Sequence, residues 1–208
     1  VVLSCAVLAL AGLGACGGDG GSVSVPAPPI TTPPPPAVQP PVNLPPRLAD
    51  TEVRISGTTP FTVGCVTGGG VLYRNSEVEP QVAVNPRDPG NIVVTWQQDR
   101  WSTGGASGIV TAASTDGGTS WTQAAFPVSR CGGGNAGNGG DYGRATDPWV
   151  TFGPTGVVYQ MALAFEGNSL QPGSRSAMLV ARSTDGGRTW SASTPLITSD
   201  SSFFNDKN

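Results

Sequence analysis

The chain has 208 residues and a net charge of −3, with its few lysines and arginines scattered, so nothing in its charge predicts nucleic-acid binding. Histidine is absent, which excludes Ser-His-Asp and Cys-His catalysis and His-ligated metal sites from this sequence. The 30 glycines, 20 prolines and only 12% charged residues predict a turn-rich all-β fold together with a disordered segment.

Residues 1–16 are predicted to be a signal peptide of the lipoprotein type. The apolar run from Val1 to Ala15 is shorter than the ~20 residues that a membrane-spanning helix needs, and it is typical of a secretory leader. Its end, Leu13 to Cys16, resembles a bacterial lipobox, in which Cys16 is lipidated. The alternative is an ordinary secretory signal that is cleaved near Ala15. Both predict an exported protein, either a bacterial cell-envelope lipoprotein or a secreted one, that meets the membrane only through a lipid anchor.

Residues 17–48 are predicted to be a disordered linker. A glycine-rich stretch at 17–21 is followed by 11 prolines between Pro26 and Pro46. Such a composition favours extended polyproline II structure and cannot build a core. We interpret it as a spacer between membrane and domain; a ligand for proline-binding domains is the alternative.

The cysteines predict one disulfide in the folded part, residues 49–208. Cys5 is removed with the leader and Cys16 carries the lipid, which leaves Cys65 and Cys131 as a pair. In an oxidising compartment these two are expected to be bonded.

Two sets of four short strands are predicted in the chain after Cys65. The first set lies at about 81–84, 92–96, 108–113 and from Trp121 onward, with a turn at 85–91. The second lies at 149–152, 157–163, 177–182 and from Trp190 onward.

The same eight-residue turn ends the third strand of each set. The sequence Ser-Thr-Asp-Gly-Gly-Thr-Ser-Trp at 114–121 returns as Ser-Thr-Asp-Gly-Gly-Arg-Thr-Trp at 183–190, 69 positions later. Asp-Gly supplies turn chemistry, and the Trp that follows offers a large surface to bury. One hairpin that recurs at a long fixed period indicates a repeat architecture, which a β-sandwich, the alternative, does not explain.

These turns resemble the Asp-box, or BNR repeat, of sialidases and related β-propellers. The resemblance implies a propeller of four-stranded antiparallel blades, with two blades and the start of a third in residues 49–208. Propellers have ~4–8 blades, so we expect this chain to be the front part of a longer protein. It also implies that the box residues are structural and lie away from the active site: Asp116, Gly118, Trp121, Asp185, Gly187 and Trp190.

Propeller geometry places the candidate site on the face opposite the boxes. Four acids are candidate catalytic residues there, three of them expected to open innermost strands and to converge on one axis: Glu79, Asp147 and Asp206, with Asp99 as the fourth. The candidate substrate-binding residues are Arg100, Tyr142, Arg144, Glu166 and Arg175. The alternative is that the acids cap backbone N–H groups or bind a structural cation such as calcium; otherwise no cofactor and no metal is predicted.

The resemblance implies an exported glycoside hydrolase of the exo-α-sialidase type, acting on sialylated or other surface glycans or glycoproteins. That chemistry uses arginines to grip a carboxylate, an acid for the leaving oxygen, and a Tyr nucleophile with a Glu. Where sialidases have Phe/Tyr-Arg-Ile-Pro, this chain has Glu77-Val78-Glu79-Pro80, which keeps the proline but not the arginine. The alternative is a non-catalytic propeller that binds a glycan or protein at the cell surface.

Overall fold

A computed structural model describes residues 52–66, 69–168, 171–203 and 206. The predicted signal peptide, lipidation site and linker lie outside these residues. Every strand of the described part belongs to one eight-stranded sheet in which each pairing is antiparallel, and none of these residues is helical. The prediction of an all-β fold is therefore confirmed.

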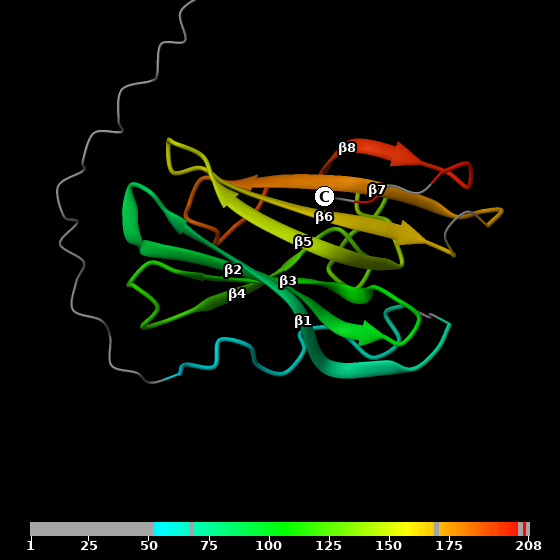
Figure 1. Ribbon diagram of the computed structural model, residues 1–208, viewed down its shortest axis with the longest axis horizontal. Helices are drawn as coiled ribbons and strands as arrows, with labels where there is room; N and C mark the ends of the chain where they lie inside the picture. The colour runs from blue at the N-terminus through cyan, green and yellow to red at the C-terminus, as the bar shows by residue number, and fades with distance from the viewer. Residues whose placement is uncertain (1–51, 67–68, 169–170, 204–205, 207–208) are drawn as a thin grey trace, which may run out of the picture. The chain divides into compact units, whose positions relative to one another are not determined.

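The strands form two successive four-stranded meanders (Figure 1). The first meander contains β1 (Leu72–Asn85), β2 (Asp88–Trp101), β3 (Ala106–Ser114) and β4 (Thr122–Phe126). The second contains β5 (Arg144–Phe152), β6 (Val158–Glu166), β7 (Arg175–Ser183) and β8 (Thr194–Ser199). A single residue pair, Ala106 with Ala145, joins them in the sheet. The repeat of four strands thus matches the prediction, and the sheet is open rather than closed over the described residues.

Local sequence explains one of the departures from the predicted strand limits. The turn between β1 and β2 is much tighter than the predicted 85–91, because Asn85 already pairs with Asp88. The Asn85 side chain accepts the N–H of Arg87, and Asp88 accepts that of Gly90, so side chains replace the missing ladder bonds. In the second meander, β8 begins at Thr194 rather than at Trp190.

The two box turns have the same internal hydrogen bonds. The Ser114 hydroxyl accepts the N–H of Gly118 at 2.8 Å, and Asp116 accepts the N–H of Ser120 at 2.9 Å. In the second box, Ser183 accepts from Gly187 at 2.9 Å and Asp185 accepts from Thr189 at 3.0 Å. The carboxylates are thus occupied by the turns themselves.

Their tryptophans pack in different places. Trp121 lies against the cluster of Phe61, Val94 and Trp96 on the first meander. Trp190 contacts the core between the meanders, with its ring 6.1 Å from that of Phe126. The second box therefore helps to fix one meander on the other.

Buried polar side chains also connect the meanders, at three levels. At the box end, Asn91 donates to Ser114 O and to Gly186 O. Midway, Gln160 donates to the Thr95 hydroxyl at 2.7 Å. At the opposite end, Gln97 donates to the Thr146 hydroxyl at 2.9 Å. Because unmade buried hydrogen bonds are costly, these three contacts restrict how the meanders can pack.

The segment before β1 is held against the first meander by a disulfide. Cys65 and Cys131 are bonded, with their Cα atoms 5.2 Å apart, as the sequence predicted. Phe61, in the same segment, is 4% exposed and packs among Trp96 and Val110. The bond thus ties the chain before β1 to the loop that follows β4, and Phe61 packs the same segment against β2 and β3.

Candidate functional site

The candidate acids within the strands lie at the end of the sheet opposite the boxes. In the first meander, Ser114, which begins the box, pairs with Ile92, whereas Asp99 and Arg100 lie at the far end of β2. In the second, Ser183 pairs with Val158, while Thr146, next to Asp147, pairs with Leu163. The register therefore separates the candidate site from the box turns.

Glu79 and Asp147 were expected to open their strands, and this expectation is wrong. Each of them interrupts a strand instead. Glu79 has φ 53° and Asp147 has φ 50°, and a register shift accompanies each residue. A proline follows both, and residues before proline favour extended backbone, so a left-handed conformation is unusual there. The two meanders thus repeat the same strained bulge, and strain of this kind is concentrated at functional sites.

These two bulges are brought together across the meanders. The backbone N–H of Asp147 donates to the Glu79 carboxylate at 3.3 Å. The Gln97 side chain also donates to that carboxylate, and to the Thr146 hydroxyl at 2.9 Å. Thr146 in turn hydrogen-bonds Asp147 Oδ1 at 3.1 Å. The two bulges are therefore in contact through the backbone N–H of Asp147, and the convergence of their carboxylates on one axis stays a prediction.

A hollow of about 240 Å³ lies beside these bulges and contains a third predicted acid. Its lining combines a cation, two acids, hydroxyl and amide groups and an aromatic wall: Arg144, Asp147, Asp206, Thr103, Thr146, Asn168 and Phe165, with Leu163 and Gly104, Gly105 and Gly167. Asp206 lines the same hollow as Asp147. Mixed charge and hydroxyl groups around an aromatic wall suit a polyhydroxylated ligand.

Arg144 supplies the positive charge of this hollow. Its guanidinium donates to the Thr103 hydroxyl at 2.9 Å and to the carbonyls of Gly104 and Gly69 at 2.8 and 3.2 Å, and it lies 5.1 Å from the centre of the Trp101 ring. No carboxylate of the described residues forms an ion pair with it. Desolvation lowers the pKa of Arg144, and the positive charge of Arg100 lowers it further, while the negative charge of Glu166 acts in the opposite direction.

Arg100 lies close by, and its polar contacts are also with uncharged groups. It donates to the Gly105 carbonyl at 2.8 Å and to Gln97 Oε1 at 3.3 Å. Arg100 and Arg144 therefore concentrate positive charge beside the hollow, where a ligand carboxylate or sulfate would be stabilised.

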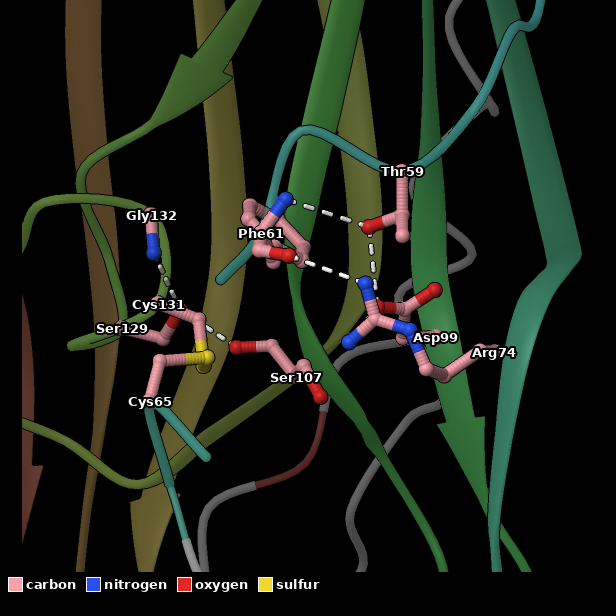
Figure 2. Close-up of a disulfide and its surroundings, with 9 residues drawn as sticks. All are labelled: Thr59, Phe61, Cys65, Arg74, Asp99, Ser107, Ser129, Cys131 and Gly132. Atoms are coloured by element: carbon pink, nitrogen blue, oxygen red, sulfur yellow. Dashed lines mark hydrogen bonds and ion pairs between the residues drawn. A yellow bond between two sulfur atoms is a disulfide. The ribbon is translucent and has the colours of Figure 1, made fainter. Parts of the chain in front are cut away.

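Asp99, by contrast, has its carboxylate buried and occupied. It is 0% exposed, and it accepts the N–H of Asn75 at 2.7 Å. It also accepts the Thr59 hydroxyl at 2.8 Å, and Arg74 Nη1 lies 3.9 Å from its Oδ2 (Figure 2). Arg74 also donates to the carbonyl of Phe61 at 3.0 Å. These contacts hold the segment before β1 against the sheet, so the structure gives Asp99 an anchoring position rather than access to substrate.

The remaining candidates gather around the loop between β4 and β5. Arg175 lies 4.5 Å from the centre of the Tyr142 ring and 3.4 Å from Asp141 Oδ2. Arg130 pairs with Asp141 at 2.7 Å and with Glu166 at 2.6 Å, and the Asp141 hydrogen bond raises the pKa of Arg130.

Tyr142 and Arg175 line a different hollow, of about 410 Å³, with residues 198–200, 202 and 203. Glu166 and Arg144 share a smaller one of about 130 Å³. The nine candidates therefore do not form one site: Asp147 and Asp206 line the first hollow, Tyr142 and Arg175 line another, and Asp99 lines neither.

Sequence reasoning missed the residues that connect the candidates. Gln97 and Thr146 have no motif around them and look like ordinary strand residues. The only available signal was positional, since both flank positions that the repeat had singled out. Arg130 and Asp141 were missed because their pairing depends on the path of a glycine-rich loop.

Three further observations complete the description. Among the described residues, no three or more His, Cys, Asp or Glu side chains gather as a metal site. The part of the chain that the structure describes has no helix long and apolar enough to cross a membrane. Comparison with protein-family models and with curated proteins finds no match for this chain.

Proposed function

We propose that the protein binds a glycan with an acidic sugar, such as a sialylated glycan, in the hollow beside the two bulges. The observation that carries this is Arg144, a partly buried cation that lines the hollow and forms no ion pair with the described carboxylates. A sugar carboxylate would pair directly with Arg144, which Glu166 meets only as a nearby charge, while Asp147, Asp206 and Asn168 offer partners for hydroxyl groups.

The wider setting that we propose is an exported, sialidase-like propeller of which this chain forms two blades. The two meanders, their equal bulges and their equal box turns support that architecture. A disulfide is typical of proteins in oxidising compartments, which agrees with export. Attachment through a lipid on Cys16 is part of the same proposal.

Hydrolysis of the glycan is the second candidate function, and one observation favours it. Glycosidases of most families use a pair of carboxyl groups on either side of the scissile bond. Glu79 and Asp147 are in contact through the Asp147 N–H, and Asp147 lines the hollow with Asp206. Asp147 and Asp206 would then be the acids nearest the bound sugar, with Glu79 supporting Asp147.

Binding and hydrolysis are tested separately on the whole chain. Titration calorimetry with 3′-sialyllactose and with lactose measures binding, and a fluorogenic sialoside measures hydrolysis. We expect sialyllactose to bind more tightly than lactose, and Arg144→Ala to weaken it by about 10- to 100-fold, as for a lost charge-assisted hydrogen bond of ~1.5–3 kcal/mol. Arg182→Ala is the control, because Arg182 lies on β7 near the box end, where it pairs with Tyr159.

Equal affinity for the two sugars, or an unchanged affinity in Arg144→Ala, would contradict the binding proposal. Release of fluorophore that Asp147→Asn abolishes would establish the second candidate. Binding without release would leave recognition as the function.

A further inference from the structure

We propose that Gln97 is a positioning residue that sets how the Glu79 and Asp147 bulges and Arg100 lie relative to one another. The inference rests on the proposed function in so far as these residues serve a ligand. Its structural part, a closed ring of hydrogen bonds through one buried amide, stands on the contacts alone.

The Gln97 side chain is wholly buried, and each of its polar atoms has a partner. Gln97 is 0% exposed. Nε2 donates one hydrogen to Glu79 Oε2 and the other to Thr146 Oγ1, and Oε1 accepts from Arg100 at 3.3 Å. An amide in the reverse orientation would turn its oxygen toward the Glu79 carboxylate and its NH₂ toward the Arg100 guanidinium. Both contacts would then be repulsive, so the neighbours determine the orientation.

The contacts continue into a ring that crosses the meanders twice. Thr146 has one hydroxyl proton, and since its oxygen accepts from Gln97, that proton is free to go to Asp147 Oδ1 at 3.1 Å. Asp147 then returns to Glu79 through its backbone N–H at 3.3 Å. The ring runs Glu79, Gln97, Thr146, Asp147 and back to Glu79, and Arg100 is attached to it at Gln97.

Only a side chain with two donors and an acceptor completes this arrangement. Glutamate at 97 would face the Glu79 carboxylate with a like charge, and an apolar side chain would leave Glu79 and Thr146 without their donor. In either case the two bulges keep only the direct hydrogen bond from the Asp147 N–H to Glu79 and lose the bridge through Gln97. We therefore expect loss of Gln97 to displace the acids and Arg100 rather than merely to weaken the fold.

Gln160 provides a matched control within the same chain. It is also 0% exposed and also bridges the meanders, donating to Thr95 at 2.7 Å and accepting from Thr111 at 2.6 Å. None of these partners is a candidate site residue. Gln160→Met and Gln97→Met thus remove the same amide from equally buried, equally bridging positions, and they differ only in what the amide touches.

The test compares these two variants of the whole chain in three measurements. Urea unfolding should show a similar loss of stability in both. Affinity for 3′-sialyllactose should fall at least about 10-fold in Gln97→Met and stay within about twofold of the wild type in Gln160→Met, by the scale of a lost buried hydrogen bond. The NMR signals of the Glu79 and Asp147 carboxyl carbons should move in Gln97→Met but not in Gln160→Met.

A double-mutant cycle separates positioning from general support of the fold. If Gln97 acts through Glu79, adding Gln97→Met to Glu79→Gln should cost much less affinity than Gln97→Met costs alone. Additive losses of affinity in the cycle would overturn the inference. Equal losses of affinity in Gln97→Met and Gln160→Met would overturn it as well. If the wild type binds no sialyllactose, the proposed function fails and the NMR comparison still decides: unmoved carboxyl signals in Gln97→Met would refute the ring.

Discussion

Substitution of Gly187 by alanine tests whether the second box turn docks on the first meander. Gly187 has φ 94°, and a Cβ atom there would lie 2.7 Å from Val93 Cγ2 and 3.3 Å from Ala113 Cβ. Gly118 occupies the same position in the first box with φ 91°, but its Cβ would meet only Trp121, at an ordinary 3.5 Å. The two glycines share motif and conformation and differ in surroundings.

The expected costs can be worked out from this difference. Alanine in a left-handed conformation costs ~1–2 kcal/mol, and this applies to both positions. In Gly187→Ala the added methyl group also presses on the Val93 side chain in a closed core, and overpacking of this kind costs ~1–3 kcal/mol. We therefore expect Gly187→Ala to lower the free energy of unfolding by about 2–5 kcal/mol and Gly118→Ala by about 1–2 kcal/mol.

Urea unfolding of the whole chain, followed by tryptophan fluorescence, measures both variants. Fluorescence is suited to this comparison because Trp190 packs between the meanders and reports on their contact. Equal losses at the two positions would refute the docking of the second turn on Val93, and with it this account of how the meanders are held together.

Three further outcomes are expected. Replacing Cys65 and Cys131 together by serine should lower the free energy of unfolding by ~4 kcal/mol, since their bond closes a long loop; a variant as stable as the oxidised protein, or a wild type unaffected by reductant, would contradict this. Asp99→Ala should cost ~1–3 kcal/mol and release residues 52–66 to limited proteolysis before the strands are cut, while sialyllactose affinity persists; loss of binding without loss of stability would instead place Asp99 in the site. Hydrogen bonds, chiefly from Ser120, lower the pKa of Asp116 to about 2, and in Asp185 the hydrogen bonds of the turn outweigh desolvation and lower its pKa as well. Because unfolding returns both groups to a pKa of about 3.9, their contribution to stability is present above about pH 4 and is lost as the pH falls toward 2. Asp116→Asn should therefore flatten the decline in the free energy of unfolding that urea unfolding measures between about pH 5 and 2. An unchanged slope would argue against this role of Asp116.

Local chemistry and periodicity determined the fold class and the repeat. The two box turns could be recognised from sequence because their hydrogen bonds join residues within four positions of each other, such as Ser114 with Gly118. The strand sets followed from short apolar runs between turn residues. The disulfide followed from elimination among four cysteines. Each of these depends on neighbours in the chain or on simple counting.

The candidate site could be predicted from the sequence only in part. The repeat placed Glu79, Asp147 and Asp206 at equivalent positions, and the structure brings Glu79 into contact with Asp147 and lines one hollow with Asp147 and Asp206. The sequence did not show that the first two are bulges with positive φ, because strand interruptions depend on the partner strand and leave little trace in composition.

Only the tertiary structure decided which charged groups are occupied and which line the hollow. Asp99 and Arg144 look alike in sequence, as charged residues near strand ends. Asp99 is buried under Thr59, 40 positions away, whereas Arg144 lies on the Trp101 ring beside the hollow. Gln97 joins Thr146, 49 positions away, through an amide that no motif identifies. Such contacts are decided by how two meanders pack, and no local pattern records that, because a buried polar group is satisfied by whichever partner the fold brings to it.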